Sequence, residues 1–152
     1  MDSATVRSIL LFFYFVLMDE KQASQAAQKV VRGLRKHIKD GNFVKDDPEK
    51  LVVFVCNQVR KTYKDRKKLL WAKNSLESSW ILPAGLDLGP WREFVSDENE
   101  EIVDAVVYSK ILKFNENSIA HGLGVTVGTL RYRIGNGIRH LGTVVQPGAL
   151  PI

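Results

Sequence analysis

The sequence predicts an all-α protein made of two small helical domains that a linker joins. Three observations predict this fold class. Apolar residues recur with the period of a helix in segments of both halves of the chain, residues 74–98 are rich in serine, proline and glycine, and the last third carries the pattern of a helix-turn-helix. A length of 152 residues suits one ordinary domain or two small ones. We therefore expect a first helical domain at residues 1–73 and a helix-turn-helix domain at residues 99–152.

The first helix is predicted from about Ser3 to Leu17, and it is apolar on nearly all sides. Such a helix must be covered on nearly all sides, so it is either a central core helix or a helix that also meets a partner or the second domain. Its apolar run, Ile9–Met18, has ten residues, about half of what a membrane-crossing helix needs. Acidic residues follow this run where a signal peptide would have small residues, and no basic segment precedes it. We therefore expect a cytoplasmic protein without a signal peptide or a membrane span.

Two further helices are predicted in the first domain. The second extends from about Glu20 to Lys39, and its alanines would allow it to approach the first helix closely. Its polar face has the composition of a solvated surface. A loop with an Asp-Gly-Asn sequence follows, in which Phe43 either tucks into the core or stacks on a ligand. Asp47 and Pro48 then begin a third helix, because a capping carboxylate before a proline is a strong helix start.

Charge is distributed unevenly along the chain, although the net charge is only +5. Residues 60–73 form a basic segment with aromatic residues among the cations, and residues 87–104 form an acidic stretch. Such a segment suits a nucleic acid, because phosphates take the charge and unstacked bases take the rings. Taken alone, it is more typical of a solvated helix end. Its cations are Arg60, Lys61, Lys64, Arg66, Lys67, Lys68 and Lys73, and its aromatic residues are Tyr63 and Trp71.

Residues 115–141 have the pattern of two short helices joined by a tight turn. Asn115 is a suitable N-cap for the first of them, and Gly124 can adopt the left-handed conformation that ends it. Thr126 then caps the second helix, whose apolar residues recur at helical spacing. A further helix over residues 99–112 is expected to pack under this unit. The apolar stripe of the second helix is Leu130, Ile134, Ile138 and Leu141.

The second helix of this unit is basic, which is the pattern of a DNA-binding helix-turn-helix. Its remaining faces carry Arg131, Tyr132, Arg133 and Arg139, as those of a helix in a major groove would. Any two-helix hairpin of an all-α protein can also show a glycine turn and an apolar stripe. Here a small residue at the helix crossing, Ala120, occurs together with the threonine cap and the basic second helix, which favours DNA binding.

Nothing in the sequence indicates catalysis. No serine, cysteine or histidine has the neighbours that a nucleophile needs, and no glycine-rich loop follows a strand. The three histidines lie far apart without the spacing of metal ligands, and the single cysteine, Cys56, lies in an apolar run. We therefore expect a protein that is not an enzyme, with a buried inert thiol, no metal and no cofactor.

In the order of these parts, the chain resembles a sigma factor of the small, two-domain, extracytoplasmic-function type. The helix-turn-helix is similar to the family's region four, in which an Ile-Ala pair, a Leu-Gly turn, a Val-Gly-Thr sequence and a basic-polar-Arg-apolar run recur. The matching positions are Ile119-Ala120, Leu123-Gly124, Val127-Gly128-Thr129 and Arg131-Tyr132-Arg133-Ile134. The first three helices are similar to region two, more loosely, through residues 23–31 and 47–68.

The resemblance implies that the protein binds core RNA polymerase and recognises promoter DNA. An anti-sigma or other regulatory protein is a further implied partner. The second helix would bind the clamp helices of the polymerase through Gln25, Gln28, Lys29 and Arg32. The separated minus-ten strand would be captured by Asn42, Phe43, Arg60, Lys61, Tyr63, Lys64, Lys67 and Lys68. The major groove of the minus-thirty-five element would receive Thr126, Thr129, Arg131, Tyr132, Arg133, Asn136 and Arg139.

Two departures from the family's pattern leave other functions open. Acidic residues usually stand where Gln25 and Lys29 lie, and Gly135 and Gly137 each cost the recognition helix about 1 kcal/mol relative to alanine. A stand-alone helix-turn-helix regulator that binds duplex DNA is the first alternative. The second is a sigma-like adaptor or decoy that acts through protein-protein contacts without recognising promoters.

Overall fold

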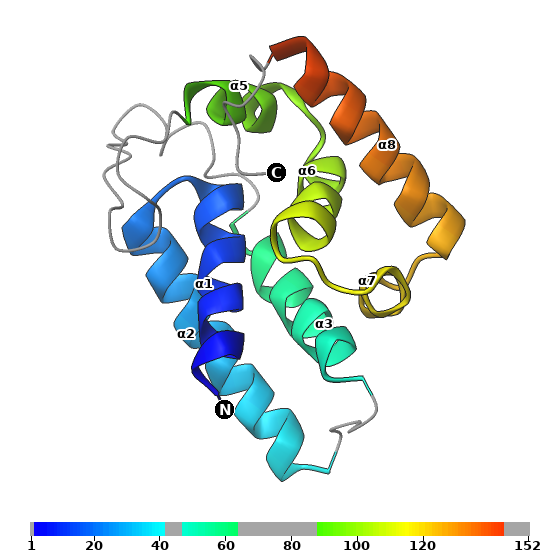
Figure 1. Cartoon of the computed structure of the whole chain (residues 1–152). Helices are drawn as coiled ribbons and strands as arrows, with labels where there is room; N and C mark the ends of the chain where they lie inside the picture. The colour runs from blue at the N-terminus through cyan, green and yellow to red at the C-terminus, as the bar shows by residue number, and fades with distance from the viewer. Residues whose placement is uncertain (1, 42–46, 64–87, 145–152) are drawn as a thin grey trace.

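The computed structural model of the protein describes residues 2–41, 47–63 and 88–144, and every regular element in these ranges is helical (Figure 1). The elements are α1 (Ser3–Leu17), α2 (Glu20–Lys39), α3 (Pro48–Lys61), α5 (Gly89–Asp97), α6 (Glu100–Val106), the π-helical segment η1 (Val107–Ile111), α7 (Glu116–Leu123) and α8 (Val127–Val144). The all-α prediction is confirmed.

The first three helices each begin after a capping aspartate, and Asp47 is the one that the sequence predicted as a cap. The Asp2, Asp19 and Asp47 carboxylates each accept a hydrogen bond from the backbone N–H three residues later, at 2.8, 2.9 and 3.0 Å. Each bond satisfies one of the N–H groups that the first turn of a helix leaves without a partner. Met18 ends α1 in the left-handed region, with φ of 56°, and so turns the chain back into α2. The predicted boundaries of α1 and α2 are therefore confirmed.

Helix α1 is the core helix of both halves of the chain, that is, of α1–α3 and of α5–α8. Every residue from Phe12 to Met18 is buried, with α2 on one side and the C-terminal helices on the other. The Phe12 ring stacks on Tyr108 with 4.3 Å between centroids, and the Trp91 indole N–H donates a 2.8 Å hydrogen bond to the Phe15 carbonyl oxygen. The N-terminal half alone could not cover the apolar surface of α1, and the C-terminal helices cover the remainder.

Helix α3 joins the two halves by packing against α7, between the α1–α2 pair and the helix-turn-helix (Figure 1). The contact is close because α7 has glycine where the helices meet. A Cβ atom added to Gly122 would lie 2.7 Å from the Val53 Cβ and 2.8 Å from the Lys50 carbonyl oxygen, nearer than real Cβ atoms come. Ser118 Oγ also donates a 2.7 Å hydrogen bond to the Asp47 carboxylate. We call the surface where α3 meets α6 and α7 the junction.

The predicted linker is partly helical. Residues 89–97 form α5, which packs on α8 and α6 and buries Trp91, Phe94 and Val95. Trp91 and Phe94, which the sequence placed in a linker, are thus core residues of the second half. Residues 74–87 of the predicted linker lie outside the described residues.

The helix expected over residues 99–112 begins after Asn99, which caps it, but it changes type after Val106. In η1 the Leu112 N–H bonds to the Val107 carbonyl oxygen at 2.9 Å, five residues back, which widens the turn. Val107 and Tyr108 are both buried by this arrangement, and Tyr108 reaches the Phe12 ring. The sequence pattern did not predict the wider turn.

The helix-turn-helix has the predicted caps and one wrong core position. Asn115 caps α7, Gly124 ends it with φ of 73°, and the Thr126 hydroxyl accepts the Thr129 N–H at 3.0 Å to begin α8. Leu130, Ile134 and Leu141 are buried as predicted, whereas Ile138 is 39% exposed.

Gly137 takes the core position that the pattern assigned to Ile138. It is buried, and a Cβ atom there would lie 2.4 Å from Cγ2 of Val106 on α6. The glycine that lowers the intrinsic helix propensity of α8 therefore permits the close approach of α6.

Candidate nucleic-acid and protein interfaces

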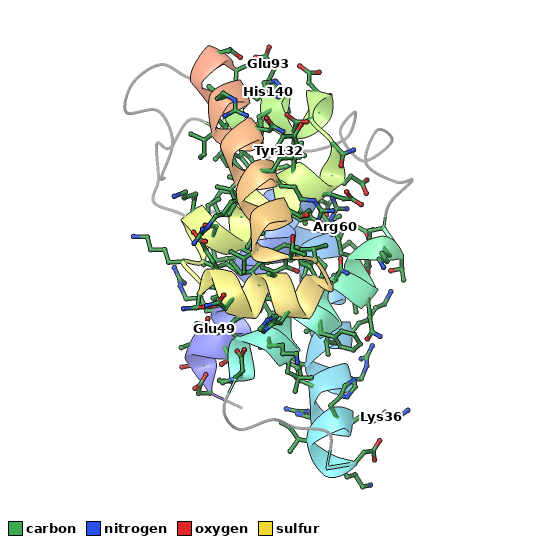
Figure 2. The ribbon with its side chains drawn as sticks, turned by 90° about the vertical axis from the view of Figure 1, so that its right-hand side faces the viewer. Lys36, Glu49, Arg60, Glu93, Tyr132 and His140 are labelled. Carbon is green, nitrogen blue, oxygen red and sulfur yellow. The ribbon has the colours of Figure 1, made fainter. Side chains whose placement is uncertain are left out.

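The outward side of α8 presents an arginine and a tyrosine to solvent. Figure 2 labels the tyrosine, Tyr132, on this helix. Tyr132 is 69% exposed, more than any other large apolar side chain in the described part of the chain. The Arg131 side chain is 70% exposed, and its Nε donates a 2.8 Å hydrogen bond to the Glu116 carboxylate on α7. This pair orients the guanidinium from a neighbouring helix, and its two NH₂ groups can still donate hydrogen bonds to a ligand.

The first turn of α8 adds two hydroxyl groups to this side. Thr126 and Thr129 are exposed, and their hydroxyl oxygens lie 3.0 Å apart in a hydrogen bond that Thr126 donates. We call this set the recognition face; it consists of the exposed residues Thr126, Thr129, Arg131, Tyr132 and Arg139 and the partly buried Asn136. Hydroxyl, amide and guanidinium groups on one exposed helix are the donors and acceptors that read base edges and phosphates.

The distal part of the recognition face is held by contacts within α8. Arg139 Nη2 donates a hydrogen bond to the Asn136 side-chain oxygen. Beside this pair, His140 Nδ1 lies 2.8 Å from the Glu98 carboxylate, and both side chains are mostly buried. The second contact fixes the end of α8 on the segment that precedes α6.

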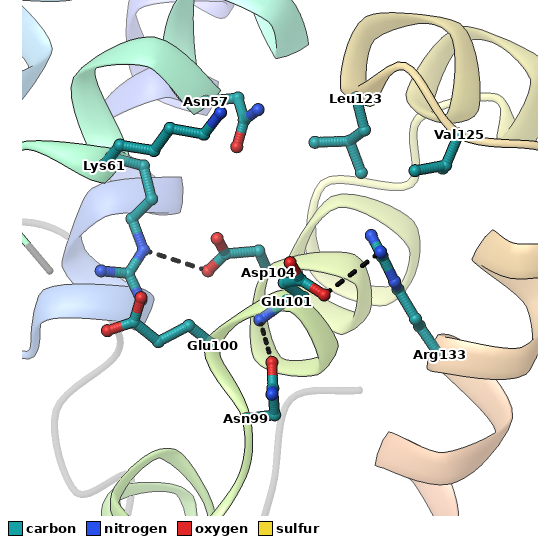
Figure 3. Close-up of a pocket in the computed structure, with 10 residues that line it drawn as sticks. Asn57, Lys61, Asn99, Glu100, Glu101, Asp104, Leu123, Val125 and Arg133 are labelled. Carbon is teal, nitrogen blue, oxygen red and sulfur yellow. Dashed lines mark hydrogen bonds and ion pairs between the residues drawn. The ribbon is translucent and has the colours of Figure 1, made fainter.

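Arg133 is directed away from the recognition face. Its Nη2 lies 3.2 Å from the Glu101 carboxylate on α6, and only 20% of its side chain is exposed, against 70% for Arg131. The sequence grouped Arg133 with the groove-reading residues. In this structure it lines a cavity at the junction instead (Figure 3).

Arg60 lies at the junction, not on the surface. It is 2% exposed, and its Nε lies 3.1 Å from Oδ1 of Asp104 on α6 (Figure 3). Its Nη1 and Nη2 atoms are buried and have no hydrogen-bond partner among the described residues. In this arrangement of the helices Arg60 is paired with a buried acid, and its predicted role in capturing the minus-ten strand stays a prediction.

Tyr63, the predicted stacking ring, is also buried, at 2% exposure. Lys29 Nζ on α2 donates a 3.1 Å hydrogen bond to its hydroxyl and lies 4.9 Å from the ring centroid. A base cannot stack on a ring that neighbouring side chains cover. Of the predicted minus-ten residues that the structure describes, Lys61 is exposed. Asn42, Phe43, Lys64, Lys67 and Lys68 lie outside the described residues.

The residues predicted to bind polymerase share one face of α2. Gln25, Gln28, Lys29 and Arg32 are all exposed and follow the spacing that brings side chains to one side of a helix. Apart from the bond of Lys29 to Tyr63, they make no side-chain hydrogen bond or ion pair among the described residues.

The junction cavity, of about 350 Å³, has both signs of charge on its walls (Figure 3). Its cations come from α3 and α8, and its acids come from α6. The lining residues are Asn57, Arg60, Lys61, Asn99, Glu100, Glu101, Asp104, Leu123, Val125 and Arg133. Beneath it, burial raises the pKa of the Cys56 thiol, and the Asp104 charge raises it further. The predicted burial of the Cys56 thiol is confirmed.

The acidic stretch proved to contain residues that the sequence analysis missed. Glu98, Glu101 and Asp104 pair with His140, Arg133 and Arg60, respectively. They stand at three-residue intervals, so they share one side of the chain that precedes and forms α6. The alternation of basic and acidic segments signalled that such pairs exist, but not which residues make them.

The fold is similar to that of the sigma factor RpoE from Bartonella quintana, solved in complex with the anti-sigma factor NepR. The similarity has a TM-score of 0.70, covers 95% of this chain and 93% of that chain, and comes with 16% sequence identity. No protein-family model and no curated protein sequence matches the chain. The sigma-factor resemblance is thus confirmed at the level of the fold. Among the residues that the structure describes, no helix is both long and apolar enough to span a membrane.

Proposed function

We propose that the protein is a sigma-factor-like transcription initiation protein, which binds core RNA polymerase and recognises promoter DNA. The recognition face of α8 carries this proposal. It places Arg131 and Tyr132 in solvent, on a helix that close packing against α6 holds rigidly. A rigid helix with exposed, oriented donors can read the major groove, as the second helix of a helix-turn-helix does.

Polymerase binding is the second part of the proposal. The α2 face with Gln25, Gln28, Lys29 and Arg32 lies on a helix outside the helix-turn-helix, so both surfaces can be occupied at once. The similarity to a sigma factor over 95% of the chain supports a role that uses both halves.

Capture of the minus-ten strand requires a change at the junction. Arg60 and Tyr63 are buried here, so the proposed strand-binding side of α3 becomes available only when α3 moves relative to α6 and α2. The neighbouring sigma factor was solved with an anti-sigma factor bound, which makes a regulatory protein a reasonable partner for this arrangement. We propose that polymerase binding provides the free energy for the movement.

The test is retention of purified core RNA polymerase by the immobilised protein, followed by transcription from genomic fragments with the reconstituted enzyme. The proposal expects retention and initiation at defined start sites. The variant Gln28→Glu with Arg32→Glu should lose retention while keeping its folded helical content. Retention without any start-site preference would remove promoter recognition from the proposal, and no retention would remove polymerase binding.

A sigma-like adaptor or decoy is the second candidate, and the junction favours it. The Arg60–Asp104 pair and the close α3–α7 contact hold the strand-binding residues away from DNA. A decoy that binds an anti-sigma factor in place of a sigma factor would need the sigma-factor fold. Its strand-binding residues could remain buried. Absence of duplex DNA binding at low salt, together with tight binding of a sigma-binding protein, would support this candidate over the first.

A further inference from the structure

Arg133 occupies a boundary position on α8. Around the helix axis it lies about 40° from Thr129 of the recognition face and about 40° on its other side from the buried Gly137. The long, flexible side chain of an arginine can turn either way from such a position. In this structure it turns toward α6, where its Nη2 lies 3.2 Å from the Glu101 carboxylate (Figure 3). Helix α8 therefore carries a cation that its recognition face does not use.

Glu101 holds Arg133 from the solvent side, because 68% of its side chain is exposed. An ion pair with so exposed a partner contributes little free energy, so a competing anion can replace the carboxylate. The Arg60–Asp104 pair lies on the same side of α6 and differs in this respect, because both of its side chains are buried. Of these two pairs, the one with Arg133 is the pair that an anion in solution can reach.

The anion that suits this position is a DNA phosphate. A carboxylate and a phosphate both accept charge-assisted hydrogen bonds from the two-pronged guanidinium group. The phosphates of a duplex flank the groove that the recognition face would enter, and they fix the position of a protein on the duplex. Arg133 lies at the edge of the recognition face next to Thr129, so it would meet the DNA backbone before it could meet a base.

We infer that Glu101 competes with DNA phosphate for Arg133 and so lowers the affinity of the protein for duplex DNA. This inference rests on the DNA-binding part of the proposed function and adds an internal competitor to it. A phosphate contact carries no sequence information, so the effect applies to a duplex of any sequence. Glu101 therefore limits non-specific binding, to which phosphate contacts supply most of the affinity.

The test is a double-mutant cycle with a matched control. Glu101→Gln removes the charge of the carboxylate and keeps its shape, Arg133→Ala removes the guanidinium, and a third variant combines the two changes. Glu100→Gln is the control, because Glu100 lies in the same first turn of α6 and takes part in none of the ion pairs found among the described residues. The probe is a labelled DNA duplex of random sequence, titrated by fluorescence anisotropy between about 50 and 200 mM salt. Circular dichroism checks that each variant is folded.

Glu101→Gln should bind the duplex about fivefold more tightly than the unchanged protein, and Glu100→Gln should bind within about twofold of it. The gain should disappear in the combined variant, whose affinity should match that of Arg133→Ala within about twofold. The plot of log affinity against log salt should be steeper by about 0.9 for Glu101→Gln than for Glu100→Gln, because Arg133 then neutralises one more phosphate.

Three results would overturn the inference, and they differ in what else they affect. Equal gains in Glu101→Gln and Glu100→Gln would reduce the effect to general charge repulsion. A gain that persists in the combined variant would show that Glu101 does not act through Arg133. Both of these results leave duplex binding by the unchanged protein intact. If neither the unchanged protein nor any variant binds the duplex at low salt, both this inference and the DNA-binding part of the proposed function are wrong.

Discussion

The two regions that the sequence marked for nucleic acid have opposite environments. Each combines arginine or lysine with tyrosine on a helix, yet α8 presents Arg131 and Tyr132 to solvent while Arg60 and Tyr63 at the end of α3 are buried. The difference lies in the partners. Arg131 pairs with an exposed acid on the adjoining helix, whereas Arg60 pairs with a buried acid from the other half of the chain. The type of residue on a helix shows what the helix could bind. The position of the nearest acidic residue decides whether the arginine is exposed to a ligand.

The strongest test of this comparison removes the buried acid. Asp104→Ala should lower the free energy of unfolding by about 3–5 kcal/mol, because the Arg60 guanidinium then stays buried without its counter-charge. Urea unfolding followed by circular dichroism measures the loss. The control is Glu101→Ala, whose partner Arg133 is partly exposed, and it should cost about 1 kcal/mol or less. Equal losses in the two variants would show that Arg60 is hydrated in solution.

The next test acts on the close contact between α3 and α7. Gly122→Ala should destabilise the protein by about 1–3 kcal/mol, because its Cβ would overlap Val53 and the Lys50 carbonyl. Gly128→Ala is the matched control, since the nearest atom to its Cβ is the Thr126 hydroxyl at 3.8 Å. The control should leave stability equal or raise it by up to about 1 kcal/mol, through higher helix propensity. If both alanine variants unfold at the same urea concentration, α3 and α7 are apart in solution.

A third test compares the two arginines of α8. Arg131→Ala should weaken binding to a duplex selected from a random pool by about tenfold or more, because a base-edge or phosphate contact is lost. Arg133→Ala should change it by less than about threefold, since Arg133 is directed toward Glu101. Fluorescence anisotropy at one fixed salt concentration measures both. An equal loss would mean that Arg133 leaves Glu101 when DNA binds.

The smallest expected effect comes from the exposed pair on the helix-turn-helix. Glu116→Ala should change the free energy of unfolding by less than about 1 kcal/mol, because exposed ion pairs contribute little. It should also raise affinity for random duplex slightly, since a negative charge beside Arg131 is removed. Thermal unfolding and anisotropy give the two values. A large loss of stability would show that the Arg131–Glu116 pair contributes as much to folding as the buried Arg60–Asp104 pair.

The elements were predictable from local signals, and the junction was not. Asp19, Asp47, Asn115, Gly124 and Thr126 act on backbone groups within a few residues, so their effect can be inferred from neighbouring sequence. The recognition face followed from the same local reasoning, because a helix that buries one stripe exposes the others.

The errors concern contacts between residues far apart in the sequence. Arg60 and Asp104 are separated by 44 positions, and no local pattern pairs them. Gly137 occupies the core position predicted for Ile138, because α6 approaches α8 too closely for a larger residue. Trp91 and Phe94 were assigned to a linker because their helix is short and begins after serine-, proline- and glycine-rich sequence. To predict each of these contacts, one would need to know which helix packs against the residue in question.

The burial of α1 by both halves has a consequence for synthesis on the ribosome. The aromatic side of α1, with Phe12 and Phe15, emerges first, and its covering residues Trp91 and Tyr108 are translated much later. During that interval the N-terminal half has an uncovered apolar surface, which favours aggregation or chaperone binding. A chain that stops before residue 88 should therefore be poorly soluble. The native protein should unfold as one cooperative unit, with no separate step for either half.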